Sequence, residues 1–386
     1  MRLPFVVALG VLLFADNTTR LNQHKVTNPR SPAPEPGAEK EVIPSLVQGL
    51  RTANDWHRKR RPDILARWLA ILGKTEPQGA DKRWFGDIRK VRVLDKAERE
   101  DYTRINLEMP IEKDFYQPHL LLLPRNQGRG PFPAVIAWTS TTPDYTAPEQ
   151  WWGAWLAARG YVVLTSWSFI RNYRDRSSYS RQAHEKVYER FGHWLALGKM
   201  VHDADREAEY LASLKEVDRK RIGFIGFSLG AKAAVYVAAF SRRVYATVAA
   251  DPHIALNGST NWFAPWYLDW LRPFPDIPTQ EHTVLSMLNP DKQRPGFEHD
   301  HHELMALTAP RPFLLIGGSH SEDTGRDSDD LQSWGYVNRA REVYRLLGVE
   351  DRIQFASTAD GHRANGPAID PAWQGFFEKW LKEKGR

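Results

Sequence analysis

The chain has 386 residues, of which 42% are hydrophobic and 26% charged, so it can bury a sizeable core and is not globally disordered. Its net charge is +6, and because both signs are interspersed along the chain this favours a solvated surface over a nucleic-acid-binding one. The chain has no cysteine, which excludes disulfides, thiolate metal sites and a cysteine nucleophile.

The N-terminal segment has the pattern of an exported protein. Residues 1–15 join a basic start to an apolar run that matches a signal-peptide core and is too short to span a bilayer. Residues 16–45 are polar and Pro-rich, which predicts a linker, and 46–386 would form the folded domain. We therefore predict a secreted or periplasmic protein with no membrane anchor beyond this candidate signal peptide. If residues 1–15 are instead a buried strand, the protein is cytoplasmic.

Apolar segments along the folded part alternate between strand and helix patterns, which predicts a mostly parallel central sheet with helices on both faces. Strands are predicted within 91–123 and at 131–138, 161–166, 222–225, 245–250, 312–316 and 352–356. Helices are predicted at 56–72, 149–159, 200–214, 231–240, 331–347 and 370–384. Residues 168–200 break the alternation and predict a lid or cleft-wall insertion, with a plain surface insertion as the alternative.

A candidate nucleophile lies between a predicted strand and a predicted helix. The strand ends in Gly226-Phe227-Ser228-Leu229-Gly230, which is the G-x-S-x-G pattern in the strand–turn–helix setting that it requires. Glycine is favoured at both flanking positions because a Cβ there would collide with neighbouring backbone. Ser228 is then exposed at the head of a helix, where N–H groups stabilise developing negative charge. The alternative is an ordinary Gly/Ser loop.

A serine hydroxyl needs a base to take its proton and a carboxylate to orient that base. His362 follows the last predicted strand in a Gly-flanked loop and is the predicted base. We favour Asp323, which follows the strand at 312–316, as the acid; Asp251, at the end of the preceding strand, is the alternative. Further carboxylates in the loop that holds Asp323 are alternatives too: Glu322, Asp327 and Asp329.

The oxyanion of an ester-cleaving intermediate needs two N–H donors. The amide of Leu229, directly after the nucleophile, is the first, and the turn after the strand at 131–138 should supply the second from Thr139 or Ser140. Of these two we favour Thr139.

Aromatic and histidine side chains suggest how a substrate is held. Among 15 tryptophans, Trp262, Trp266 and Trp270 are predicted to form flat apolar walls against sugar rings. The cluster from Glu298 to Glu303 contains three histidines but matches no zinc signature, so we predict no metal there. A hydrogen-bonding role in the pocket wall is predicted for His301 instead.

Five sequence blocks carry a family resemblance: 226–232, 261–268, 300–312, 343–346 and Gly361-His362. Together they resemble bacterial α/β-hydrolases of the acetyl xylan esterase and dienelactone hydrolase-like group, from about Trp56 to the C-terminus. The resemblance implies an α/β-hydrolase fold, no cofactor, and an acylated oligo- or polysaccharide as substrate. Glucuronoyl esterases are more distant relatives, and in them the acid can follow the strand after the nucleophile helix, where Asp251 lies here. Trp138 departs from the histidine common in nearer relatives.

The predicted function is that of a serine carboxylesterase that works through an acyl-enzyme and acts on acylated carbohydrate. An oligopeptidase-like amidase is one alternative, although no propeller-type repeats precede the domain. A catalytically inactive hydrolase fold that binds glycans through its tryptophans is the other, and the Ser228 and His362 pair argues against it.

Overall fold

The computed structural model describes residues 43–141, 144–172, 181–192, 194–252, 254, 301–318, 331–358 and 361–383. Within these residues one sheet has the strand order β1-β2-β3-β5-β4-β6-β7-β8-β9. The strands are β1 (Arg92–Glu98), β2 (Tyr102–Glu112), β3 (Phe115–Pro124), β4 (Phe132–Trp138), β5 (Val162–Ser166), β6 (Val217–Phe227), β7 (Ala246–Ala250), β8 (Phe313–Gly318) and β9 (Ile353–Thr358). The pairs from β1 to β5 are antiparallel, and the strands from β5 to β9 run parallel to one another.

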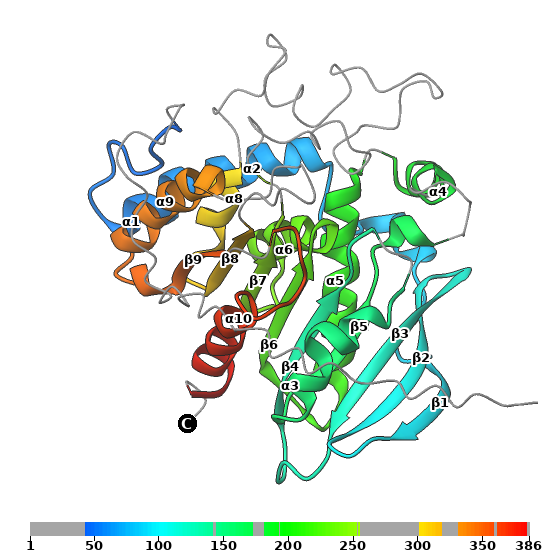
Figure 1. Ribbon diagram of the computed structural model, residues 1–386. Helices are drawn as coiled ribbons and strands as arrows, with labels where there is room; N and C mark the ends of the chain where they lie inside the picture. Colours follow the sequence, from blue (N-terminus) through cyan, green and yellow to red (C-terminus); the bar gives the residue numbers. More distant parts are fainter. Residues whose placement is uncertain are drawn as a thin grey trace, which may run out of the picture.

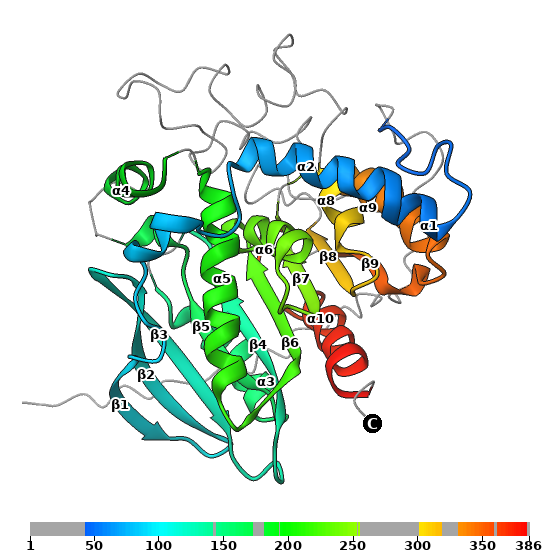
Figure 2. The same cartoon turned by 180° about the vertical axis from the view of Figure 1, so that it is seen from behind.

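Helices cover both faces of the sheet. On one face lie α2 (Arg61–Leu72), α5 (Ala196–Ser213), α6 (Leu229–Phe240), α8 (His301–Thr308) and α9 (Leu331–Leu346), which stand in front in Figure 2. The other face carries α3 (Ala154–Ala157) and α10 (Asp370–Phe377), which stand in front in Figure 1. The remaining short helical segments are α1 (Ala53–Asp55), η1 (Trp56–Arg60), η2 (Gly79–Trp84), η3 (Glu149–Gly153), η4 (Phe169–Arg171), α4 (Arg181–Phe191), η7 (Glu350–Arg352) and η8 (Glu378–Lys382).

Alternation along the central strands produces two apolar layers. In β4, Ile136 and Trp138 pack into the core beneath α5 and α6, whereas Val135 and Ala137 pack into the core beneath α3 and α10. Successive strand residues face opposite sides, so a strand covered on both faces needs apolar residues throughout. This is why β4, β5 and β7 are predominantly apolar in the sequence, and the predicted sheet with helices on both faces is confirmed.

The elements follow the sequence pattern with two differences in extent. The strand that carries the nucleophile motif runs over 217–227 and is longer than the apolar run at 222–225. Its polar first half pairs with β4 only at Val217. Helix α5 begins at Ala196, so the end of the expected insertion 168–200 is part of a core helix. The rest of that segment contains η4 and α4, and its role as a lid stays a prediction. Residues 1–42, with the candidate signal peptide, lie outside the described residues.

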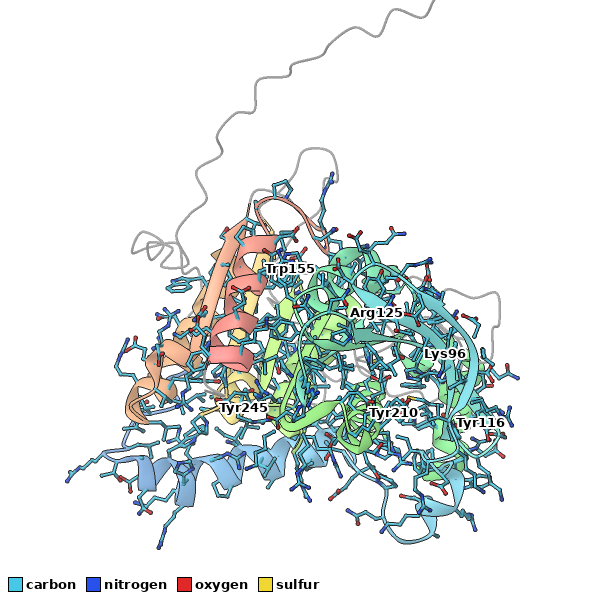
Figure 3. The ribbon with its side chains drawn as sticks, turned by 90° about the horizontal axis from the view of Figure 1, so that it is seen from below. Lys96, Tyr116, Arg125, Trp155, Tyr210 and Tyr245 are labelled. Carbon is cyan, nitrogen blue, oxygen red and sulfur yellow. The ribbon has the colours of Figure 1, made fainter. Side chains whose placement is uncertain are left out.

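The parallel strands all end at one edge of the sheet, and this edge positions the site. Phe227 at the end of β6 pairs with Ala250 at the end of β7, and Ala250 pairs with Ile316 of β8. Figure 3 views the molecule from below, where the labelled Tyr245 precedes β7 and Tyr210 lies in the last turns of α5. None of the helices in the described ranges has the length and apolar character that crossing a bilayer requires.

Candidate active site

Ser228 occupies the sharp turn between β6 and α6. Its φ of 53° and ψ of −109° lie in a region that side chains other than glycine rarely adopt, and such strain clusters at functional sites. The Ser228 amide donates to the Ala250 carbonyl at 3.1 Å, so the turn is fixed to the end of β7. A Cβ on Gly226 would lie 2.1 Å from the Gly230 carbonyl oxygen, which explains why this turn needs glycine at position 226.

Asp251 and His362 meet at the same edge of the sheet. Asp251 directly follows β7 with a φ of 55°, and its amide donates to the Ile316 carbonyl at 2.7 Å. The Asp251 side chain is 3% exposed and its Oδ2 is hydrogen-bonded to Nδ1 of His362, which is 32% exposed. An ionised carboxylate only accepts hydrogen bonds, so Nδ1 carries the hydrogen and Nε2 is the basic nitrogen, directed away from Asp251.

The loop that carries His362 is held beside the serine turn by aromatic side chains. The His362 ring lies 4.7 Å from the ring of Phe227, the residue directly before Ser228. Trp152 of η3 donates from Nε1 to the Ala364 carbonyl at 2.9 Å, two residues further along the loop. This loop leads down to α10 (Figure 1). The imidazole therefore stands next to the strained turn.

Lys232, one turn into α6, is a residue of the site that the sequence argument missed. Its side chain is 1% exposed, and its ammonium donates to the Pro252 carbonyl, directly after Asp251. The Lys232 amide also donates to the Ser228 carbonyl at 2.9 Å, so this residue links the serine turn to the acid turn. A lysine inside an otherwise apolar, Ala-rich helix was the available signal, because a buried ammonium needs a fixed acceptor.

The two N–H donors expected for an oxyanion differ in availability. Leu229 is the first residue of α6, where a backbone N–H has no partner within the helix. The Thr139 amide donates to the Ser166 carbonyl at 3.1 Å, which completes the β4–β5 ladder and engages the donor favoured from the sequence. The next amide, Ser140, has no acceptor among the described residues and is the better candidate.

Helix α6 packs directly on the turn that carries Ser140. A Cβ on Gly230 would lie 2.5 Å from the Thr139 carbonyl oxygen and 2.7 Å from that of Trp138. Only glycine allows this approach, so the second glycine of the motif serves the contact between the helix and the turn as well as the elbow. The amino end of α6 and the end of β4 thus form one wall of the site.

His301 lies inside the helical layer, against α6 and α2. At the start of α8 its side chain is 1% exposed, its Nε2 lies 3.3 Å from the Tyr236 hydroxyl, and its ring contacts Trp68. The hydrogen-bonding role in the pocket wall and the contact with substrate expected of His301 stay predictions. No cluster of three or more metal-ligating side chains occurs in the part of the chain that the structure describes. Other predicted site residues lie outside the described residues: Trp262, Trp266, Trp270 and Asp323.

Comparison with known sequences identifies related proteins. The model of the dienelactone hydrolase family matches residues 124–264. The chain is 25% identical over 263 residues to a 4-O-methyl-glucuronoyl methylesterase of Phanerochaete carnosa, with 63% of each chain covered. It is 34% identical over 87 residues to 4-O-methyl-glucuronoyl methylesterase 1 of Phanerochaete chrysosporium, covering 22% of this chain and 18% of the relative. The chain thus spans less than two thirds of the length of these curated relatives.

Solved structures show the same fold over most of the chain. A glucuronoyl esterase from Solibacter usitatus superposes with a TM-score of 0.64 at 17% identity and covers 89% of this chain and 97% of its own. One from Teredinibacter turnerae gives a TM-score of 0.61 at 17% identity and covers 89% of each chain. Together with the sheet order and the family match, these findings show an α/β-hydrolase fold and confirm the resemblance read from the sequence.

Proposed function

We propose that the protein is a serine-dependent carboxylic ester hydrolase that acts on carbohydrate esters, with Ser228 as nucleophile, His362 as base and Asp251 as acid. One observation carries the proposal: a strained serine turn lies beside an imidazole whose Nδ1 is hydrogen-bonded to a buried carboxylate. A serine is activated by this arrangement of base and orienting acid, whatever the fold that supplies it.

The proposed reaction proceeds in two halves. As the Ser228 oxygen attacks the ester carbonyl carbon, Nε2 of His362 takes the hydroxyl proton, and Asp251 stabilises the imidazolium that results. The amides of Leu229 and Ser140 hold the negative oxygen of the tetrahedral intermediate. His362 then returns the proton to the leaving alcohol, which departs and leaves an acyl-enzyme. A water molecule, deprotonated by His362, releases the acid and restores Ser228.

Asp251 is preferred to Asp323 as the acid because its carboxylate contacts the imidazole. Its backbone supports the same choice: Asp251 adopts a left-handed φ that costs about 1–3 kcal/mol, and such strain persists where the surrounding structure holds it for a purpose. The bond from its amide to β8 and the Lys232 bond to Pro252 fix the turn on both sides.

For the substrate we propose an ester whose acyl part is a uronic acid sugar. The support is that curated relatives and superposed structures carry the names glucuronoyl methylesterase and glucuronoyl esterase. An acetylated polysaccharide, in which the sugar is the alcohol, is the alternative that the sequence resemblance raises. A polymeric carbohydrate substrate also agrees with the export proposed from residues 1–15.

The test compares the protein with its Ser228→Ala variant on benzyl glucuronoate, acetylated xylo-oligosaccharides and p-nitrophenyl acetate. We expect hydrolysis of the glucuronoate, a loss of about 10⁴- to 10⁶-fold in kcat for the variant, and labelling of Ser228 alone by a fluorophosphonate probe. Faster cleavage of the acetylated sugars than of the glucuronoate would indicate that acetyl esters are the substrates. Full activity of Ser228→Ala, or no labelling of the folded protein, would refute the mechanism and favour the inactive glycan-binding alternative.

A further inference from the structure

We infer that a buried pair, His119 and Glu207, acts through the Trp138 indole to hold the β4 turn that presents the Ser140 amide to the oxyanion. The inference rests on the proposed function, because the oxyanion exists only during ester hydrolysis. His119, Glu207 and Trp138 act on the reaction through the turn, so they are positioning residues.

A hydrogen bond joins the two side chains of the pair. His119 on β3 and Glu207 on α5 both have fully buried side chains. Nδ1 of His119 lies 2.9 Å from the Gln117 carbonyl oxygen and Nε2 lies 2.9 Å from Oε1 of Glu207. Both neighbours are acceptors, so either the imidazole carries hydrogen on both nitrogens or Glu207 is protonated. In both cases the two side chains are joined by a hydrogen bond without water.

The second oxygen of Glu207 holds β4. The Trp138 indole donates from Nε1 to Oε2 at 2.7 Å, and the Trp138 side chain is completely buried. Glu207 is therefore hydrogen-bonded to a side chain of β3 and to a side chain of β4, two strands that the sheet order separates by β5. The carboxylate is a clamp across three strands, and both of its oxygens are satisfied, as a desolvated carboxylate requires.

The strand between them is tied into the same network. The hydroxyl of Ser166, the last residue of β5, accepts a hydrogen bond from the side-chain amide of Gln117 at 2.8 Å. The Ser166 carbonyl accepts the Thr139 amide at 3.1 Å. This leaves Ser140 as the first residue of the turn whose N–H is not drawn back into the sheet.

Movement of Trp138 would be transmitted to the site because the turn is closely packed. The carbonyls of Trp138 and Thr139 press against Gly230 in the first turn of α6, with no room for a Cβ. Loss of the indole anchor would let the end of β4 shift relative to Leu229, and the two N–H donors would no longer converge. A misplacement of about 1 Å costs on the order of 10²-fold in rate.

The experiment uses three variants of the full chain. Trp138→Phe removes the indole donor. Glu207→Gln preserves the network, because its carbonyl can accept from Trp138 while its NH₂ donates to Nε2 of a neutral His119. Trp68→Phe is the matched control: Trp68 is equally buried and donates to the buried Glu303 carboxylate at 2.8 Å, away from β4. If Trp138→Phe does not fold, Glu207→Met replaces it, since methionine fills similar space and offers no comparable acceptor.

Two measurements are made on each folded variant: kcat and KM on the ester that the protein hydrolyses, and hydrogen–deuterium exchange of the peptide at 134–141. We expect Trp138→Phe to lower kcat by about 10- to 100-fold with little change in KM, and to speed exchange at the turn. Glu207→Gln should keep near-normal kcat and exchange, and Trp68→Phe should change neither.

The inference is overturned if Trp138→Phe behaves as Trp68→Phe does. It is also overturned if Glu207→Gln lowers kcat as much as Trp138→Phe does, because the charge of Glu207 and not its hydrogen bonds would then matter. If the unaltered protein cleaves no ester, the proposed function fails separately. The exchange rates then decide alone whether the clamp holds the turn.

Discussion

Two histidine–carboxylate pairs among the described residues lie in opposite settings. His362 and Asp251 stand at the ends of the parallel strands, and the His362 side chain is 32% exposed. His119 on β3 and Glu207 on α5 have side chains with no exposure. In the first pair Asp251 engages Nδ1 and directs Nε2 elsewhere; in the second, both ring nitrogens face acceptors.

This difference separates the proposed general base, His362, from a structural histidine, His119. A general base needs one nitrogen that the substrate can reach, and an imidazole with both nitrogens engaged inside the core can only hold its neighbours in place. The backbones agree: Asp251 occupies a strained turn, whereas Glu207 is in the middle of a regular helix. The following predictions test this division of roles, from the largest expected effect to the smallest.

Replacing each histidine by alanine should give the widest separation. His362→Ala removes the proposed base and should lower kcat by about 10⁴- to 10⁶-fold. His119→Ala only loosens the clamp and should cost about 10- to 100-fold. Added imidazole should restore part of the activity of His362→Ala and none of that of His119→Ala, because only the first leaves an open space beside Ser228. Equal losses, or rescue of His119→Ala alone, would reverse the assignment.

The two candidate acids are compared through matched amide substitutions. Asp251→Asn should lower kcat by about 10⁴-fold, since an amide no longer fixes the correct imidazole tautomer. Asparagine tolerates the left-handed backbone of Asp251, so circular dichroism should show an unchanged fold. Asp323→Asn should retain activity. If Asp323→Asn lost activity and Asp251→Asn retained it, the triad acid would be Asp323, in the loop at 319–330.

Asp203, one turn before Glu207 on α5, is expected to affect stability rather than catalysis. Burial raises its pKa to about 7, although Lys199 lies 2.6 Å from Oδ1 and opposes the shift. The folded protein therefore keeps a proton that the unfolded chain releases above about pH 4, so this group's contribution to stability falls as pH rises towards 7. Measured by urea unfolding, the difference between the protein and Asp203→Asn should decline over this range by at most about 1.4 kcal/mol per pH unit. A pH-independent difference would contradict the shift.

Local pattern was enough for the parts of the fold that are contiguous in the chain. The apolar runs predicted the strands because both faces of the central sheet are buried. The five residues around Ser228 predicted the elbow because the close approach of Gly226 to Gly230 is contained within them. His362 was predicted from its place after the last strand, which chain order alone provides.

Only the tertiary structure decided which distant groups meet. His362 and Asp251 are 111 positions apart, and β7 and the loop after β9 bring them together although Asp323 was favoured from chain order. Because β4 pairs with β5, the Thr139 amide is hydrogen-bonded to the Ser166 carbonyl, and the Ser140 amide is proposed as the oxyanion donor instead. His119 and Glu207 lie 88 positions apart on a strand and a helix whose patterns predict only burial. Hydrogen-bond partners of this kind depend on packing in three dimensions, which no local spacing records.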